Sequence, residues 1–352
     1  MSYTWDTVNT AIIPRLLGFK RPQLFKGAGY ICEKLWAGKK VEKINMFEVP
    51  LKHASDATPQ GLQALGELQG SHGEILNKGY DNMVFGGDLA IISHKEFRAQ
   101  GGAERFINLI DERISGKLEG QRNAFNASIW RRTAAVPASD TQSLQMNGMY
   151  DVYDKTIDIH NLDYANYSIW QPIVYDASAD LTGTPGTREG ITQDPTSEVY
   201  IENMLDLVVE NFRARGILPN DGVIVMPAAM MSAYRSILRA QDRLTPGKLM
   251  VKLGYDSVNY RGYDVGVDDW MSVNQTGDTD GWIVGVPMSD ITLYVNDPNG
   301  ISVGGFDGDM KLTYRGAQLL FDRQLAIHNR HRFIFITNVW NKKSIIKDAI
   351  ET

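Results

Sequence analysis

The stretch GGAERFINLIDERISGKLEGQRNAFNASIWRR, residues 101–132, changes the pattern of the chain to a long helix. Apolar side chains recur along it at four-residue spacing and then continue as a stripe that drifts around the axis: Phe106, Ile110, Ile114, Leu118, Phe125 and Ile129. Side chains at this spacing share one face of an α-helix. The pattern predicts a helix of about 28 residues, roughly 42 Å long, which Gly116 and Gly120 weaken without ending it.

Two segments before this helix alternate between apolar and polar residues, as strands do. They cover residues 40–53 and 81–97, and a stretch rich in Gly, Gln and Ser separates them. The pattern predicts a long two-stranded excursion over residues 40–98. A hairpin of this kind is marginally stable alone in water, so we expect it to need a neighbour.

The first 39 residues predict an extended arm, because prolines and glycines are mixed with scattered large apolar side chains. Such side chains pack on something, for example another subunit. Residues 1–43 carry a balance of +5, whereas the remainder of the chain carries −11. A basic segment can touch nucleic acid or an acidic neighbour, but the acidic remainder argues against extensive DNA binding.

Helices and strands alternate after the long helix, which predicts a compact α/β or α+β unit. The expected elements are short strands at 149–159 and 167–175, a helix capped by Thr196 or Ser197 that ends by Gly216, a strand at 222–227, a helix at 228–244, and strands at 260–270, 281–287 and 291–297. The intervening residues 181–190 are rich in Gly and Thr, but no strand leads into them and no GK[ST] follows. We therefore expect a loop there rather than a phosphate site.

The residues that could carry chemistry do not form a known catalytic or metal-binding motif. Cys32 is the one cysteine, which excludes an internal disulfide and a thiolate cluster within one chain. No histidine pair has the spacing of a helical zinc protease, and no G-x-S-x-G is present. The paired aspartates 278/280 and 307/309 lack the full spacing of a calcium loop. We expect no enzyme activity, no cofactor and no metal.

The chain has an ordinary globular composition, with 352 residues, 43% hydrophobic and 22% charged. Its longest apolar runs span a few residues, far short of the roughly 20 that cross a bilayer. The amino terminus lacks the features of a signal peptide. We expect a cytoplasmic site of synthesis and no membrane partner.

The segment LAIHNRHRFIFITNVW, residues 325–340, has two histidines and two arginines before an apolar run. Treated as one strand, it places His328 and His331 on opposite faces, so they cannot share a metal without a bend. Arg330 and Arg332 fall on the face of His328. The segment therefore predicts the polar entry to a closing strand that is apolar on both sides and buried in a sheet, with its cations bonding across a subunit boundary.

The order of these elements resembles the major capsid protein of tailed bacteriophages, the Hong Kong 97-type fold. On the amino side the resemblance is carried by GDLAIISHKEFRAQGGAERFINLIDERISGKLEGQRNAF (87–125). On the carboxyl side it is carried by DGVIVMPAAMMSAYRSIL (221–238), YRGYDVGVDDW (260–270), DGWIVGVPMSDITLYV (280–295) and FDRQLAIHNRHRFIFIT (321–337). It covers nearly the whole chain, but through element order and local patterns rather than an invariant motif.

The resemblance implies an α+β fold in five parts. These are an N-terminal arm (1–39), an extended loop or hairpin (40–98), a peripheral domain with a spine helix and strands (99–195), an axial domain (196–305), and the closing peripheral strands with the C-terminal tail (306–352). Many relatives carry a scaffolding region before the arm, whereas this chain starts with Met almost at the arm. A separate scaffolding protein, or one removed from the numbered chain, is therefore expected.

The implied function is self-assembly into the icosahedral head shell around double-stranded DNA, as pentamers and hexamers. A portal is an implied partner, decoration proteins are left open, contact with the packaged DNA is non-specific, and the protein would belong to the virion. An encapsulin, which is a compartment shell, is the alternative within the fold, and a cytoplasmic hydrolase using Asp and His is a more distant one. Candidate inter-subunit contacts are Arg15, Lys20, Arg21, Lys43, Lys52, Arg330, His331 and Arg332.

Covalent cross-linking between subunits is not expected. Some relatives join a lysine to an asparagine side chain, and Lys43, Lys52 and Lys78 lie near the hairpin. Nothing in the sequence singles out an asparagine and a carboxylate to go with them.

Overall fold

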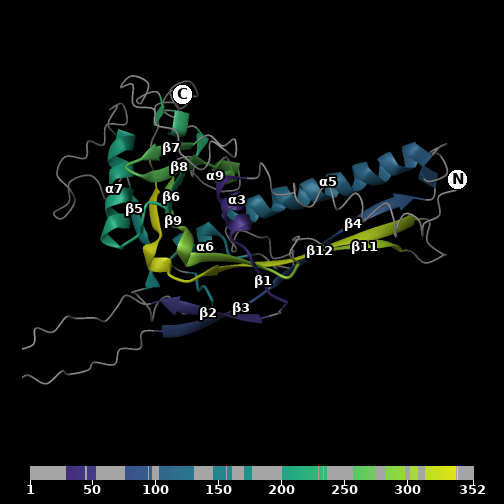
Figure 1. Ribbon diagram of the computed structural model, residues 1–352, viewed down its shortest axis with the longest axis horizontal. Helices are drawn as coiled ribbons and strands as arrows, with labels where there is room; N and C mark the ends of the chain where they lie inside the picture. The colour runs from purple at the N-terminus through teal and green to yellow at the C-terminus, as the bar shows by residue number, and fades with distance from the viewer. Residues whose placement is uncertain are drawn as a thin grey trace, which may run out of the picture.

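The structure is a computed structural model. It describes residues 29–43, 46–52, 76–93, 95–96, 103–130, 146–155, 157–160, 170–176, 200–228, 230–232, 234–235, 257–268, 270–273, 282–297, 302–307, 314–337 and 339. These parts form an elongated molecule, in which a long helix and long strands extend away from a compact part at the other end (Figure 1). The expected arm residues 1–28 and loop 181–190 lie outside the described residues.

The long helix α5 spans Ala103–Trp130, which confirms the predicted length of 28 residues. Its predicted stripe is the buried face, since Ile110, Ile114, Leu118, Phe125 and Ile129 are almost fully inaccessible. The charged residues of the helix lie on its other sides. This division is what an amphipathic helix produces when it covers a sheet.

The long sheet that α5 covers is built around one strand, β12 (Tyr314–Ile327). Its order is β1 (Lys40–Val41), β10 (Ile291–Val295), β12 and β11 (Ser302–Asp307), and β4 (Val84–Ser93) also pairs with β12. β4 runs antiparallel to β12 from Val84 opposite Arg323 to Ser93 opposite Tyr314. Together these two strands and α5 form the extended part of the molecule (Figure 1).

A six-stranded sheet forms the core of the compact part. Its order is β5 (Ile173–Asp176), β13 (Ile334–Thr337), β9 (Ile283–Pro287), β6 (Gly222–Met226), β8 (Tyr263–Val267) and β7 (Ser257–Tyr260). Helix α7 (Tyr200–Ala214) lies within the predicted helix and covers one face with the buried residues Ile201, Leu205, Val208 and Phe212.

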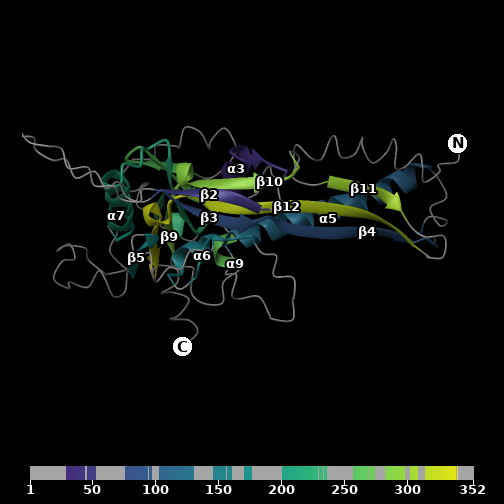
Figure 2. The same cartoon turned by 90° about the horizontal axis from the view of Figure 1, so that it is seen from below.

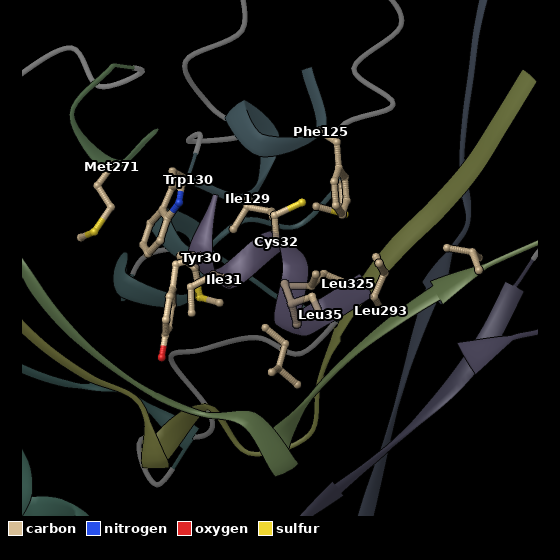
Figure 3. Packing of buried hydrophobic residues seen from close by; sticks show 14 of the residues in the cluster. Tyr30, Ile31, Cys32, Leu35, Phe125, Ile129, Trp130, Met271, Leu293 and Leu325 are labelled. Carbon is tan, nitrogen blue, oxygen red and sulfur yellow. The ribbon is translucent and has the colours of Figure 1, made fainter. Parts of the chain in front are cut away.

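The other face of this sheet belongs to a second hydrophobic core, which it shares with α5 and with α3 (Tyr30–Ala37). Ile31, Cys32 and Leu35 of α3 pack among side chains of α5, β10 and β12 (Figure 3). Because both faces are covered, β13 is apolar on both sides, as predicted. Phe335 enters one core and Ile336 the other.

The predicted hairpin pairs different strands from those expected. β2 (Met46–Lys52) pairs with β3 (Leu76–Asn82), and β4 leaves the hairpin to pair with β12. The buried residue Met83 separates β3 from β4. Alternation placed strands at both segments correctly, but it carries no information about which strand is the partner.

Two predicted strands are wrong in part. Residues 149–153 form a short helix, α6 (Met149–Tyr153). Of the second predicted strand, residues 173–175 lie in β5, residues 170–172 are not in a strand, and residues 167–169 lie outside the described ones. The segment 325–340 is also not one strand, because β12 ends at Ile327 and a 3-10 turn, η7 (Arg330–Arg332), precedes β13. The faces assigned to its charged residues by alternation therefore do not apply.

The sheets also cross the boundaries expected between domains. β10 and β11, inside the predicted axial segment 196–305, join the long sheet, whereas β13 of the closing segment joins the six-stranded sheet. Of the helix predicted at 228–244, residues 228, 230–232 and 234–235 are helical, and residues 236–244 lie outside the described ones. Within the described part of the chain, no helix has the length and apolar character to cross a membrane.

Candidate assembly surfaces

The long sheet has one covered face and one face that is partly open. Ala90, Ile92, Ala317 and Leu319 point toward α5 and are buried. The alternate side chains of the same two strands point away from α5, and three of them are large, apolar and exposed: Leu89 at 36%, Ile91 at 43% and Leu320 at 47%. We call these three residues the outer stripe. Figure 2 shows the sheet from below, with α5 behind β4 and β12.

Glycines make room for the leucines of the outer stripe. A Cβ atom at Gly316 would lie 2.8 Å from Leu89 Cδ1, and one at Gly87 would lie 3.3 Å from Leu320 Cδ2. Both leucines therefore lie across the neighbouring strand instead of standing off the sheet. The outer stripe thus gathers three exposed apolar side chains on one face of β4 and β12, beside the exposed Gln318 opposite Leu89. Exposed apolar side chains that lie together are the kind of surface that marks an interaction site.

The chain's own hairpin covers the other end of the same sheet face. Val49 of β2 is buried there against Ala326 and Tyr294, with Met83 and Trp170 completing the cluster. This cluster has five residues, far fewer than either main core. The hairpin is therefore held to the body by a small apolar contact.

A polar network adds to that contact at the root of the hairpin. Asp81 of β3 accepts hydrogen bonds from Asn147 Nδ2 at 2.5 Å, His160 Nδ1 at 2.9 Å and Gln324 Nε2 at 3.2 Å. The other ring nitrogen of His160 accepts the backbone N–H of Ile327 at 2.9 Å, so the ring is neutral with its proton on Nδ1. The carboxylate of Asp81 thus joins the hairpin to β12 and to residues 147–160.

We expect Asp81→Asn to loosen the hairpin. The new amide donor would face groups that are themselves donors, and an unsatisfied buried polar contact costs about 2 kcal/mol, which corresponds to roughly 30-fold more frequent opening. Hydrogen exchange read by mass spectrometry should show faster exchange in β2 and β3. Glu112→Gln, on the exposed side of α5, is the control. Equal exchange rates in both variants would contradict the role of Asp81.

The structure places the predicted contact residues in different surroundings. Arg15, Lys20 and Arg21 lie outside the described residues. Lys43 is exposed just after β1, and Lys52 is the last residue of β2. A subunit contact through any of these five stays a prediction.

Arg330 does not have the surroundings of an inter-subunit contact. It is fully buried, and its guanidinium donates to the carbonyl oxygens of Val152 at 2.9 Å, Ile157 at 3.2 Å, Asp151 at 2.9 Å and Asp154. Burial lowers the pKa of Arg330 to about 10, although nearby carboxylates oppose this shift. Arg330 was predicted to bond across a subunit boundary, whereas in this structure its guanidinium bonds carbonyl groups of its own chain, because the residue lies in a turn and points into the chain.

The neighbours of Arg330 also bond within the chain. Arg332 Nη1 lies 2.6 Å from Asp290 Oδ2, and Asp290 is fully buried. His331 Nδ1 lies 3.3 Å from the carbonyl oxygen of Gln171, and burial followed by the charge of Arg215 lowers the pKa of His331. A further contact of His331 or Arg332 with another subunit stays a prediction.

The described residues contain no group of three His, Cys, Asp or Glu side chains that could hold a metal ion. Cys32 is buried in the core, and burial, more than the nearby charge of Asp268, raises the pKa of its thiol. A thiol in such surroundings is unreactive.

Solved structures resemble this chain over most of its length. The capsid asymmetric unit of cyanophage A-1(L) has a TM-score of 0.63 at 11% identity, with 89% of this chain and 93% of that chain covered. The capsid of a native GTA particle has a TM-score of 0.54 at 12% identity, over 87% and 90%. The SrpI encapsulin of Synechococcus elongatus PCC 7942 has a TM-score of 0.51 at 10% identity, over 85% and 84%.

No protein-family model and no curated protein sequence matches the chain. At 10–12% identity, the structural likeness establishes the fold. The chain has the α+β Hong Kong 97-type capsid fold, and the predicted fold class is confirmed.

Proposed function

We propose that this chain is the major capsid protein of a tailed bacteriophage and that it self-assembles into the icosahedral shell that encloses double-stranded DNA. The observation that carries the proposal is the fold shared with the cyanophage A-1(L) capsid over 89% of the chain. The partners that follow are further copies of the chain in pentamers and hexamers, with a separate scaffolding protein and a portal. The chain would assemble in the host cytoplasm and remain in the virion.

The outer stripe supports assembly independently of the fold. Three large apolar side chains, each more than a third exposed, lie on the same face of β4 and β12. Burying what remains exposed of each side chain contributes about 1 kcal/mol. A shell repeats every contact many times, so a weak contact of this size is sufficient. The proposed role is structural rather than enzymatic.

An encapsulin shell is the second candidate, and it is supported by the likeness to the SrpI encapsulin. That likeness has the lower TM-score, 0.51 against 0.63 for the cyanophage capsid. The contents of the particles separate the two functions, since a phage head holds DNA and a compartment holds an enzyme. Neighbouring terminase and portal genes would favour the phage head, and a neighbouring peroxidase or ferritin-like gene would favour the compartment.

Assembly is tested by negative-stain microscopy and sedimentation of the expressed chain, with and without scaffolding protein. We expect shells, tubes or rings from the wild type, and mainly unassembled chain from Leu320→Asp, because a carboxylate in the outer stripe resists desolvation. Leu218→Asp is the matched control, since Leu218 is 69% exposed in the loop between α7 and β6, away from the stripe. A wild-type chain that stays monomeric at high concentration would contradict the proposal.

A further inference from the structure

One arginine of β12 lies over two aromatic rings. The Cζ atom of Arg323 lies 4.5 Å from the ring centre of Phe125 and 4.7 Å from that of Phe321. Gly86 on β4 lies opposite Phe321, and a Cβ atom there would lie 2.1 Å from the ring. The absence of a side chain at Gly86 therefore lets the Phe321 ring lie across β4, next to the guanidinium.

The stack continues from β12 through α5 to α3. Phe125 of α5 meets Trp36 of α3 edge to face, with ring centres 6.5 Å apart, and Lys39 Nζ lies 4.2 Å from the Trp36 ring. We call Lys39, Trp36, Phe125, Arg323 and Phe321 the cation–aromatic stack. A cation above an aromatic ring is attracted to the negative face of the ring. The stack thus holds the Arg323 guanidinium in one orientation.

This orientation leaves the edge of the guanidinium without a counter-charge. Among the described residues, Arg323 is partly exposed and its guanidinium has no carboxylate or hydrogen-bond acceptor. Burial lowers the pKa of Arg323 to about 10, so the group is still charged at neutral pH. The contacts with the two rings leave the N–H groups of the guanidinium for a hydrogen-bond partner.

The other charges near the stack are balanced. Arg122 and Glu33, like Arg323, are close enough to Cys32 to shift the pKa of its thiol, and Arg122 Nη2 lies 3.3 Å from Glu119 Oε1. On α5, Arg113 and Lys117 also have carboxylate partners, which are Glu96 and Asp88. In the part of the chain that the structure describes, these paired cations leave Arg323, Lys39 and Lys40 as the basic groups near the stack that a polyanion such as DNA could meet. A single carboxylate is a better match for one planar, pre-oriented guanidinium.

We propose that Arg323 binds the carboxylate of an Asp or Glu side chain from a second copy of this chain in the assembled shell. The charge distribution supports this partner, because the chain beyond residue 43 carries −11. A guanidinium that already packs on aromatic rings loses little side-chain freedom when it forms a bidentate pair of hydrogen bonds with a carboxylate. This inference rests on the proposed assembly, and it adds the chemistry of one subunit contact.

The test uses Arg323→Lys in assembled particles together with a carbodiimide, which joins an amine to a carboxylate that touches it. Particles are made from equal amounts of chain labelled with nitrogen-14 and with nitrogen-15. We expect a cross-link from position 323 to an acidic residue, found in peptides that combine the two labels. Arg113→Lys is the control for the reaction, because Glu96 Oε1 lies 2.8 Å from Arg113 Nη2 in the same chain. The cross-link between Lys at position 113 and Glu96 should therefore be found in peptides that carry one label.

Links from position 323 that always carry one label would place the acceptor in the same chain and overturn the proposal. The absence of a link at 323, while the Arg113→Lys link forms, would overturn it as well. If wild-type chain forms no particles, the proposed function fails instead, and this outcome is visible before any cross-linking.

A wild-type measurement serves if the lysine variant does not fold or assemble. Phenylglyoxal modifies accessible arginines, and mass spectrometry reads each site. We expect Arg323 to react in unassembled chain and to lose this reactivity in particles, including particles treated with nuclease in high salt. Equal reactivity in both states would overturn the proposal. Protection that disappears with the nucleic acid would also overturn it, in favour of a phosphate partner.

Discussion

Replacing Arg330 with methionine is expected to lower the free energy of unfolding by about 4 kcal/mol, the range found when one partner of a buried charged contact is removed. The guanidinium donates to carbonyl oxygens of four residues between 151 and 157. Methionine fills much of the volume but donates nothing, so these buried acceptors lose their partner. The turn after α6 should lose its structure first.

Urea denaturation followed by tryptophan fluorescence measures this loss in the unassembled chain. Arg213→Met is the matched control, because Arg213 is exposed on α7, and we expect a change within about 0.5 kcal/mol there. Arg330→Lys should recover only part of the stability, since an ammonium cannot reach carbonyl groups spread as widely as those around a guanidinium. A methionine variant as stable as the wild type would show that the carbonyl groups find other donors.

The second large effect concerns the packing of α7 on the six-stranded sheet. Phe212 is fully buried, and its ring lies over Gly285 of β9, where a Cβ atom would be 2.9 Å from the ring. Phe212→Ala should cost about 4 kcal/mol, through lost burial and the cavity left behind. Gly285→Ala alone should cost about 2 kcal/mol, because the methyl group would lie 2.8 Å from Val208 Cγ1 and 2.9 Å from the Phe212 ring and forces both side chains away.

The double variant distinguishes this packing from two independent effects. With Phe212→Ala in place, the methyl group of Gly285→Ala enters the space that the ring has left, apart from a contact with Val208. The double variant should therefore lose less stability than the two single variants together, by about 1 kcal/mol or more. Thermal and urea unfolding of all four chains gives the coupling. Additive losses would mean that the ring and the glycine do not contact each other.

The elements that were predicted well are those whose pattern is complete within one segment. The helix Ala103–Trp130 and the strands at 222–226, 283–287 and 291–295 follow from the spacing of their apolar residues. A helix and a strand bury apolar residues at different spacings, so the spacing along the chain indicates which of the two forms and which face is buried. The fold class could be recognised because the order of such elements survives at sequence identities near 11%.

The features that were missed depend on residues far apart in the sequence. The partner of β4 is β12, more than 200 positions away, and alternation in either strand is the same with any partner. Alternation predicted Arg330 as a subunit-boundary contact, because it treats residues 325–340 as one strand and cannot show the turn η7 or the contacts of Arg330 with residues 151–157. A buried guanidinium is also uncommon without such partners.

The surfaces proposed for assembly also depend on residues far apart in the sequence. Leu89, Ile91 and Leu320 look like ordinary strand residues in the sequence, and their exposure is decided by α5 and the hairpin covering other parts of the sheet. Two signals could have drawn attention to the region, namely Gly86 and Gly87 inside an apolar strand, since glycine in a strand marks a close approach. Nothing in the sequence around Arg323 indicates that it contacts Phe125 of α5, because the two residues are far apart in the chain.

By itself the sequence determined which segments are helices and strands, which of their faces are apolar, and the order that makes the fold recognisable, because each of these depends on side chains a few positions apart. Only the tertiary structure decided how the strands pair, which arginine is buried and which stays open, and where an apolar face is left uncovered. The physical reason is that burial is a property of the whole packed chain. A side chain is desolvated, paired or exposed according to which distant segments come to lie against it.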